Sequence, residues 1–289
     1  ATDLLNLVTG RLGAEGWALF TSPAFDICDL VRRIGGDGHA RWHSRVRGLP
    51  ETLGDLPAST LAEEMETPGP GQVRAFLTFA GNPVLSTPNG RRLDRALAGR
   101  DFMVSIDLYV NETTRHADVI LPPAWGLAED HVDLMFANYF VRNVARWSPA
   151  VVERGADERA DWEILLELTE RLGGGPTGNT VLDGILAVAR RLGFRCNPAT
   201  MAELTLRMGR YGDRFLPWSR GLNRRRLDAA PHGIDLGPLE TGITRRVFHA
   251  DGKVHLADGP FAAAVADLAA TLPHAPAAGG LLLIGRREL

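Results

Sequence analysis

Three short apolar runs, separated by polar loops, dominate the middle of the chain. They cover Val73–Phe79, Phe102–Ile106 and Val119–Leu121, and a segment with helical spacing, Asn89–Ala98, lies between the first two. Short apolar runs bounded by Gly, Pro, Asn and Asp are typical of buried strands, and their alternation with a helix predicts a βαβ unit. We therefore predict that the three runs are adjacent parallel strands of one sheet, with the helix crossing right-handedly between the first two.

The rest of the pattern divides the chain into four parts. Residues 1–45 are expected to be the tail of an upstream α/β domain, and residues 46–72 a connection that holds one short helix. Residues 73–175 are expected to form a Rossmann-like region, whose last helix is capped by Asp161. Residues 176–289 are expected to be helical and loop-rich and to lead into a C-terminal domain. The expected fold class is α/β: a Rossmann-like three-layer domain with a parallel sheet, flanked by helical and loop-rich segments.

Helical spacing outside the central region predicts further elements. Helices are expected over residues 3–12, 25–34, 181–192, 199–208 and 261–272, and a short strand over residues 17–20. The chain opens without Met and ends on an apolar run that is typical of the start of a strand. We therefore expect it to be a segment of a longer polypeptide.

Composition excludes several classes of partner. The 289 residues carry 32 Lys and Arg against 35 Asp and Glu, and this net charge of −3 argues against nucleic acid as a partner. No apolar run approaches the roughly 20 residues that span a bilayer, so no membrane insertion is expected.

The two cysteines, Cys28 and Cys196, lack C-x-x-C spacing. They cannot by themselves hold an iron–sulfur cluster, and we interpret them as small buried residues. The scattered histidines show no metal-ligand spacing, so no metal site is predicted.

Polar residues follow two of the predicted strands at the point where each ends. Gly81-Asn82-Pro83 follows the first strand, and Asp107 follows the second. The carboxyl ends of parallel strands are where nucleotides bind in such sheets. Asn82 offers a donor and an acceptor to a base or ribose, and Asp107 accepts hydrogen bonds from ribose hydroxyls or guanine N–H groups. The alternatives are an Asn-Pro turn that closes a strand and a cap for the segment near Asn111.

A set of short motifs continues from these residues. It runs Gly81-Asn82-Pro83, Ser105-Ile106-Asp107, Asn111-Glu112-Thr113, Ala117-Asp118-Val119-Ile120-Leu121-Pro122 and Asp161-Trp162-Glu163-Ile164-Leu165. In order and spacing the set resembles the molybdopterin-dependent oxidoreductases of the dimethyl sulfoxide reductase family, which includes formate dehydrogenases and nitrate reductases. The resemblance covers about residues 71–172. It implies that the guanosine end of a molybdopterin guanine dinucleotide binds Gly81, Asn82, Pro83, Ile106 (through its backbone), Asp107 and Asp161.

The resemblance also implies a function. The chain would be part of a molybdenum or tungsten oxidoreductase with a bis-molybdopterin guanine dinucleotide cofactor, acting on a small-molecule substrate and working with an electron-transfer subunit. A 4Fe-4S cluster and the metal's protein ligand would lie in an N-terminal part outside this chain, since neither Cys28 nor Cys196 matches that ligand. No catalytic residue is therefore named. The cytoplasm is the expected compartment, with the periplasm as the alternative.

Two other classes of protein are alternatives to this function. A catalytically silent structural subunit, resembling the large subunit of respiratory complex I, would share the fold without the molybdenum site. The pair of Asn82 and Asp107 argues mildly against it. An ordinary nicotinamide-binding domain fails because no G-x-G-x-x-G follows a strand. One departure from the family concerns charge: some relatives have a lysine in the segment that here contains Glu129, so no cofactor contact is assigned to Glu129.

Overall fold

The computed structural model describes residues 2–33, 35–36, 38–134, 136–175, 180–191, 193, 197–247, 249–255 and 259–271. The chain forms two compact units, of which the first combines Ala1–Phe20 with Leu239–Leu289 and the second is Thr21–Pro238. None of the described helices is long and apolar enough to cross a membrane. The division of the chain into four parts stays a prediction.

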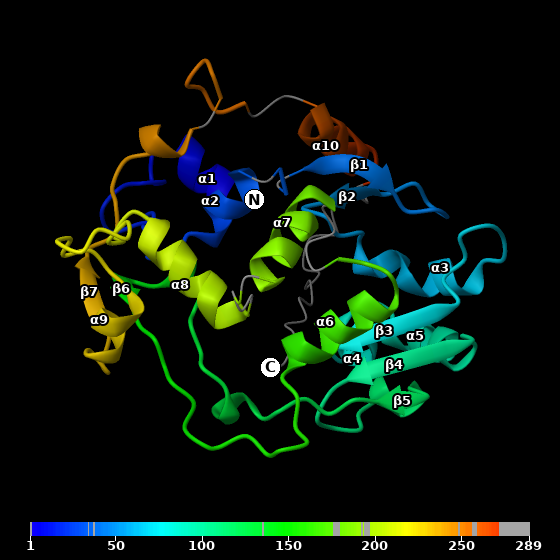
Figure 1. Cartoon of the computed structure of the whole chain (residues 1–289). Helices are drawn as coiled ribbons and strands as arrows, with labels where there is room; N and C mark the ends of the chain where they lie inside the picture. The colour runs from blue at the N-terminus through cyan, green and yellow to red at the C-terminus, as the bar shows by residue number, and fades with distance from the viewer. Residues whose placement is uncertain are drawn as a thin grey trace. The chain divides into compact units, whose positions relative to one another are not determined.

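The second unit contains a parallel sheet of three strands (Figure 1). Its strands are β3 (Ala75–Phe79), β4 (Phe102–Ile106) and β5 (Val119–Ile120), in the order β3-β4-β5. Ala75 pairs with Phe102 at one end of the β3–β4 ladder, and Phe79 pairs with Ile106 at the other. The helix α5 (Gly90–Ala98) connects these two strands. The α/β class and the parallel order of the three predicted strands are thus confirmed.

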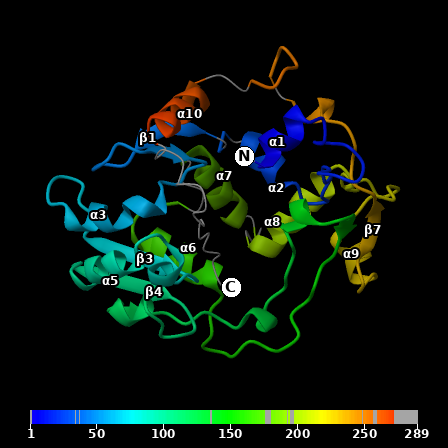
Figure 2. The same cartoon turned by 180° about the vertical axis from the view of Figure 1, so that it is seen from behind.

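Two helices cover one face of this sheet (Figure 2). The helix α3 (Leu61–Glu66) is the short helix predicted within residues 46–72, and it packs beside α5. Leu93, Ala96 and Leu97 recur at helical spacing on α5 and are buried against Met103 of β4. The hydroxyls of Thr78 and Ser105, neighbours in the strand register, lie 2.8 Å apart in this core and satisfy one another.

The opposite face of the sheet is apolar and partly exposed. Side chains alternate between the two faces of a strand, so the neighbours of the buried Met103 and Thr78 point away from α3 and α5. Leu77, Phe79, Phe102 and Val119 are between 41% and 47% exposed there. Parallel sheets normally bury both faces, so this one exposes more apolar surface than its type usually does.

The rest of the second unit is built from short elements. The helices are α2 (Ile27–Arg33), α4 (Pro83–Ser86), α6 (Asp161–Arg171), α7 (Thr180–Arg191), α8 (Pro198–Met208) and α9 (Arg224–Asp228). Antiparallel pairs join β1 (His39–His43) to β2 (Pro50–Thr52) and β6 (Asn143–Ala145) to β7 (Ile234–Gly237). Single 3₁₀ turns cover Ala58–Thr60, Thr114–His116, Gly126–Ala128 and Phe136–Tyr139. A second core gathers Ala24, Phe25, Ala145, Trp147, Ala202, Leu206, Leu222 and Leu227.

The first unit joins two distant segments of the chain. It contains α1 (Thr2–Val8), a 3₁₀ turn (Thr244–Arg246) and α10 (Gly259–Thr271). Phe20 and Glu240 exchange two backbone hydrogen bonds, and Gly242 donates to the carbonyl of Gly13 at 2.8 Å. Gly13 has a φ of +80° and a Cβ there would lie 2.9 Å from the backbone of Gly242, so this crossing requires glycine.

Several expectations about single elements need correction. The helices predicted over residues 181–192, 199–208 and 261–272 are α7, α8 and α10, but the one expected over residues 3–12 ends at Val8. The predicted strand over residues 17–20 forms only isolated bridges. Cys28 lies in the first turn of α2 and is exposed to solvent there, so its interpretation as a small buried residue is wrong. Cys196 and the apolar run near the C-terminus lie outside the described residues.

Candidate functional site

The loop after β3 turns sharply at the edge of the sheet. The N–H of Ala80 donates to the carbonyl of Ile106 at 3.0 Å, which ties the ends of β3 and β4 together. Asn82 then precedes α4, whose first residue is Pro83, a position where the missing N–H of proline costs nothing. The carbonyl of Asn82 accepts the first helical hydrogen bonds, so the Asn-Pro turn expected as the structural alternative is present as well.

The fold does not require glycine at position 81. A Cβ at Gly81 would meet the carbonyl of Phe79 at 3.6 Å and the ring of Pro83 at 3.9 Å, which are ordinary contact distances. Gly90 differs, because a Cβ there would overlap the carbonyl oxygen of Val84. Gly90 is therefore needed by the fold, whereas the fold would tolerate a Cβ at Gly81.

The side chain of Asn82 is held by the loop that follows β4. Its Nδ2 donates to Oε2 of Glu112 at 2.7 Å, and its Oδ1 accepts from the hydroxyl of Thr113 at 2.7 Å. The same hydroxyl accepts the N–H of Val84 at 3.0 Å. The hydrogen bond from Asn82 lowers the pKa of Glu112, and the charge of nearby Arg115 adds to this effect. Glu112 is therefore an ionised acceptor at neutral pH.

Asp107 organises the second loop. Its carboxylate accepts the N–H of Tyr109 at 3.1 Å and Nδ2 of Asn111 at 3.3 Å. The carbonyl oxygen of the Asn111 side chain in turn accepts the N–H groups of Thr113 and Thr114. A chain of hydrogen bonds thus leads from Asp107 through Asn111 and Thr113 to Asn82. The capping role considered as the alternative for Asp107 is real, and it leaves lone pairs on both carboxylate oxygens.

The structure brings five of the six predicted residues to one edge of the sheet. They lie at the carboxyl ends of β3 and β4 and comprise Gly81, Asn82, Pro83, Ile106 and Asp107. Ile106 is fully buried, so only its backbone is available at this edge. The sequence motif contained Glu112 and Thr113 but gave them no role. A run of polar residues between two apolar strands was the signal that could have found them.

Asp161 opens α6, but it is not the N-cap. The N-cap is Ala160, whose N–H donates to the side chain of Glu163 at 2.9 Å, so the predicted cap is wrong by one residue. Asp161 instead accepts the N–H of Trp162 in the first turn, where the helix dipole favours a carboxylate. Burial, and then the charge of Asp161, raises the pKa of Glu129. No hydrogen bond or ion pair between described residues joins Asp161 to Asn82 or Asp107, and its convergence with them stays a prediction.

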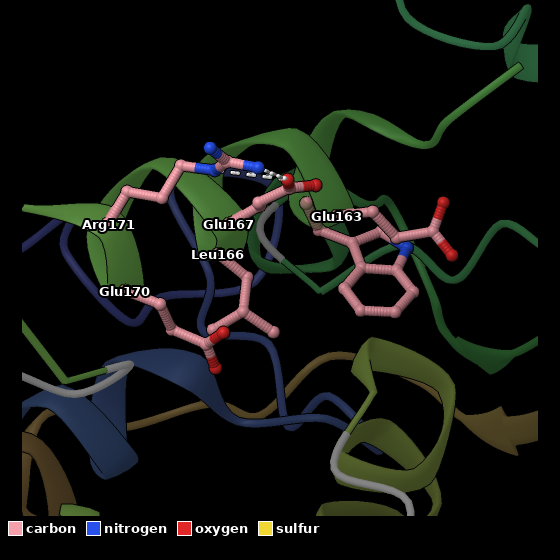
Figure 3. Close-up of a pocket in the computed structure, with 6 residues that line it drawn as sticks. Glu163, Leu166, Glu167, Glu170 and Arg171 are labelled. Carbon is pink, nitrogen blue, oxygen red and sulfur yellow. Dashed lines mark hydrogen bonds and ion pairs between the residues drawn. The ribbon is translucent and has the colours of Figure 1, made fainter.

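Two cavities lie along α6. The first has a volume of about 540 Å³ and is lined by Trp162, Glu163, Leu166, Glu167, Glu170 and Arg171. Figure 3 shows Arg171 and Glu167 pointing toward one another, and their ion pair measures 2.6 Å. The second, of about 400 Å³, connects Leu121 and Pro122 at the end of β5 to Arg159 and Arg171. Glu167 pairs with both arginines, so a carboxylate already holds each cation of this cavity.

Metal ligation is not evident in the part of the chain that the structure describes. Among those residues, no group of three or more His, Cys, Asp or Glu side chains is placed to hold a metal ion. The loops after β3 and β4 form a hydrogen-bonded polar site at the edge of the parallel sheet. Its donors and acceptors suit a nucleoside better than a metal ion.

Comparison with known proteins identifies the family. The family model described as molybdopterin oxidoreductase matches residues 3–171, which is more than half of the chain. The chain belongs to the molybdopterin oxidoreductase family. The match includes the three strands of the parallel sheet, both loops of the candidate site and all of α6. The resemblance drawn from the short motifs is thus confirmed.

Individual relatives share parts of the chain. The assimilatory nitrate reductase catalytic subunit of Bacillus subtilis is 29% identical over 185 residues, which are 58% of this chain and 25% of the relative. The F420-dependent formate dehydrogenase subunit alpha of Methanocaldococcus jannaschii is 36% identical over 105 residues, 36% of this chain and 15% of the relative. The chain thus spans a quarter or less of these relatives. Neither name supports the alternative of a silent structural subunit.

Among solved structures, acetylene hydratase from Pelobacter acetylenicus overlaps 41% of this chain and 16% of its own, with a TM-score of 0.37 and 24% identity. That overlap is partial, and the fold assignment rests on the strand pairing described above.

Proposed function

We propose that the edge of the sheet formed by the loops after β3 and β4 binds the guanosine end of a molybdopterin guanine dinucleotide. The observation that carries the proposal is the hydrogen-bonded link between Asn82 and Asp107 at the ends of two parallel strands. Nucleotides bind at this edge in open α/β sheets. Membership of the molybdopterin oxidoreductase family supports a pterin cofactor in particular.

The donors and acceptors of the two loops fit a guanosine. The amide of Asn82 offers two N–H groups and two lone pairs, of which one each is used within the protein. Asp107 keeps a lone pair on each oxygen, and a carboxylate matches the paired N–H donors of guanine. The fold would tolerate a Cβ at Gly81, so its absence there favours a close approach of the ligand to the backbone next to Asn82.

Local charge favours the nucleoside over the phosphates at this position. The carboxylates of Asp107 and Glu112 both belong to the loop after β4, and Glu112 lies within 2.7 Å of the Asn82 amide. A phosphate brought to the same amide would approach an anion and be repelled. The pyrophosphate is therefore expected farther from this edge, with the base or ribose against Asn82 and Asp107.

The cofactor, when bound, supplies two-electron chemistry at molybdenum or tungsten, and the residues of this chain bind and orient it. For the whole enzyme we propose the bis-molybdopterin form and a small-molecule substrate. We also propose an electron-transfer subunit, which is supported by relatives that are named as alpha subunits. A 4Fe-4S cluster needs four protein ligands, usually cysteines, and this sequence has two cysteines. Such a cluster would therefore be held outside this chain.

Cofactor content tests the proposal. Protein isolated from cells supplied with molybdate is expected to release GMP and pterin in equal amounts, with two of each per metal ion. In Asp107→Ala the content of both should fall, while the activity per bound metal stays near that of the unmodified protein. Asp55→Ala, at an exposed aspartate outside the two loops, is the matched control. Pterin without GMP would overturn the guanosine assignment, and a protein without metal or pterin would revive the silent structural subunit.

A further inference from the structure

The amide of Asn82 is held in one orientation by two residues from another loop. The hydroxyl of Thr113 accepts the N–H of Val84 at 3.0 Å, so its single hydrogen is left to donate to Asn82. The group that faces Thr113 must then be Oδ1, the acceptor of the amide. Glu112, an ionised carboxylate, only accepts, so the group that faces it must be Nδ2.

The flipped amide is excluded by both contacts. It would turn Oδ1 of Asn82 toward the carboxylate of Glu112, where two acceptors repel one another. It would also turn Nδ2 toward the hydroxyl of Thr113, whose own hydrogen would lose its acceptor. Thr113 is fully buried, so this unmet donor would carry the full cost of desolvation. The orientation of the amide is thus fixed before any ligand arrives.

We propose that Glu112 and Thr113 are positioning residues, which preset the Asn82 amide so that its remaining N–H and its remaining lone pair face the nucleoside. The proposal rests on the proposed function of this edge of the sheet. A preset amide loses little rotational freedom on binding, and it presents its donor and its acceptor at fixed positions. Neither residue needs to touch the ligand for this effect.

A double-mutant cycle with GDP as the probe tests the proposal on the full chain by titration calorimetry. Glu112→Gln replaces an acceptor-only group by an amide that pairs with Asn82 in either orientation, and we expect about tenfold weaker binding. Thr113→Val should weaken binding to a similar degree, and Thr113→Ser, which keeps the hydroxyl, should rescue it. Glu153→Gln, an exposed substitution outside this network, is the control for the change of charge.

The cycle separates positioning from a general structural role. If Glu112 acts through Asn82, Glu112→Gln should weaken GDP binding no further in an Asn82→Ala background. The side-chain amide protons of ¹⁵N-labelled Asn82 should be sharp and separate in the free unmodified chain and should broaden in Glu112→Gln. GDP binding that neither Glu112→Gln nor Thr113→Val weakens would overturn this inference alone. No GDP binding to the unmodified chain would overturn the proposed function and this inference together.

Discussion

Two glycines near the candidate site are expected to respond in opposite ways to the same substitution. In Gly81→Ala the new methyl group meets the carbonyl of Phe79 at 3.6 Å and the ring of Pro83 at 3.9 Å, so the fold accommodates it. The φ of Gly81 is not in the left-handed region, and the free energy of unfolding should stay the same or rise by about 0.4–1 kcal/mol. In Gly90→Ala the methyl group overlaps the backbone of Val84 and should cost about 1–3 kcal/mol.

Gly81→Ala, which the fold tolerates, should nevertheless weaken ligand binding. If a nucleoside lies against Asn82, the methyl group of Gly81→Ala occupies space that the ligand needs, and GDP should bind about tenfold more weakly, or about 1.4 kcal/mol. Urea unfolding followed by circular dichroism gives the stability of each variant, and calorimetric titration with GDP gives the affinity. The hypothesis is that a ligand, and not the fold, requires glycine at position 81. It would be refuted if Gly81→Ala lowered the stability of the chain, or if it left the affinity unchanged in a chain that binds GDP.

Further substitutions test the site and its support. Asp107→Ala should weaken GDP binding by roughly 1.5–3 kcal/mol, the range for a hydrogen bond to a charged group, and Asp107→Asn should keep part of it in the same titration. Leu97→Ala should cost about 2–5 kcal/mol of unfolding free energy in urea, because Leu97 is fully buried between α5 and the sheet. Asp213 is buried, and pairing with Arg207 lowers its pKa from 3.8 to about 2. The ionised side chain of Asp213 therefore contributes about 2 kcal/mol to the free energy of unfolding above pH 3.8, and this contribution is lost as the pH falls toward 2. In urea unfolding measured across this pH range, Asp213→Asn should abolish the acid dependence.

The central sheet could be predicted from the sequence because each strand is short, apolar and ended by a turn residue. Phe102–Ile106 and Val119–Leu121 have no alternation, which is typical of strands in a parallel sheet. The antiparallel pair of β1 and β2 was not predicted, because its inward residue is Glu51. That carboxylate is fully buried and accepts hydrogen bonds from Arg41 and Gly54. A polar residue in a buried position gives no hydrophobic pattern to follow.

The polar residues of the site could be predicted only in part. Asn82 and Asp107 follow strands, and this position alone predicted that they meet at one edge. The partners of Asn82 could not be identified, because Glu112 and Thr113 are 30 and 31 residues away in sequence and meet it only through the strand register. The cap of α6 was misplaced because Ala160 has no side-chain acceptor, and the cap depends on Glu163 reaching back to its N–H.

The two loops of the site stabilise one another without a ligand, and this has a consequence for binding. Thr113 contacts both Asn82 and the first turn of α4, while Asn111 ties the same loop to Asp107. Each polar side chain that faces the proposed nucleoside is therefore already ordered by a partner inside the protein. These loops must be ordered in any case to close the ends of β3 and β4. The entropy cost of ordering them therefore arises on folding and not on ligand binding. A nucleoside would then meet a preformed set of donors and acceptors, and its affinity would depend chiefly on how well guanine and ribose match them.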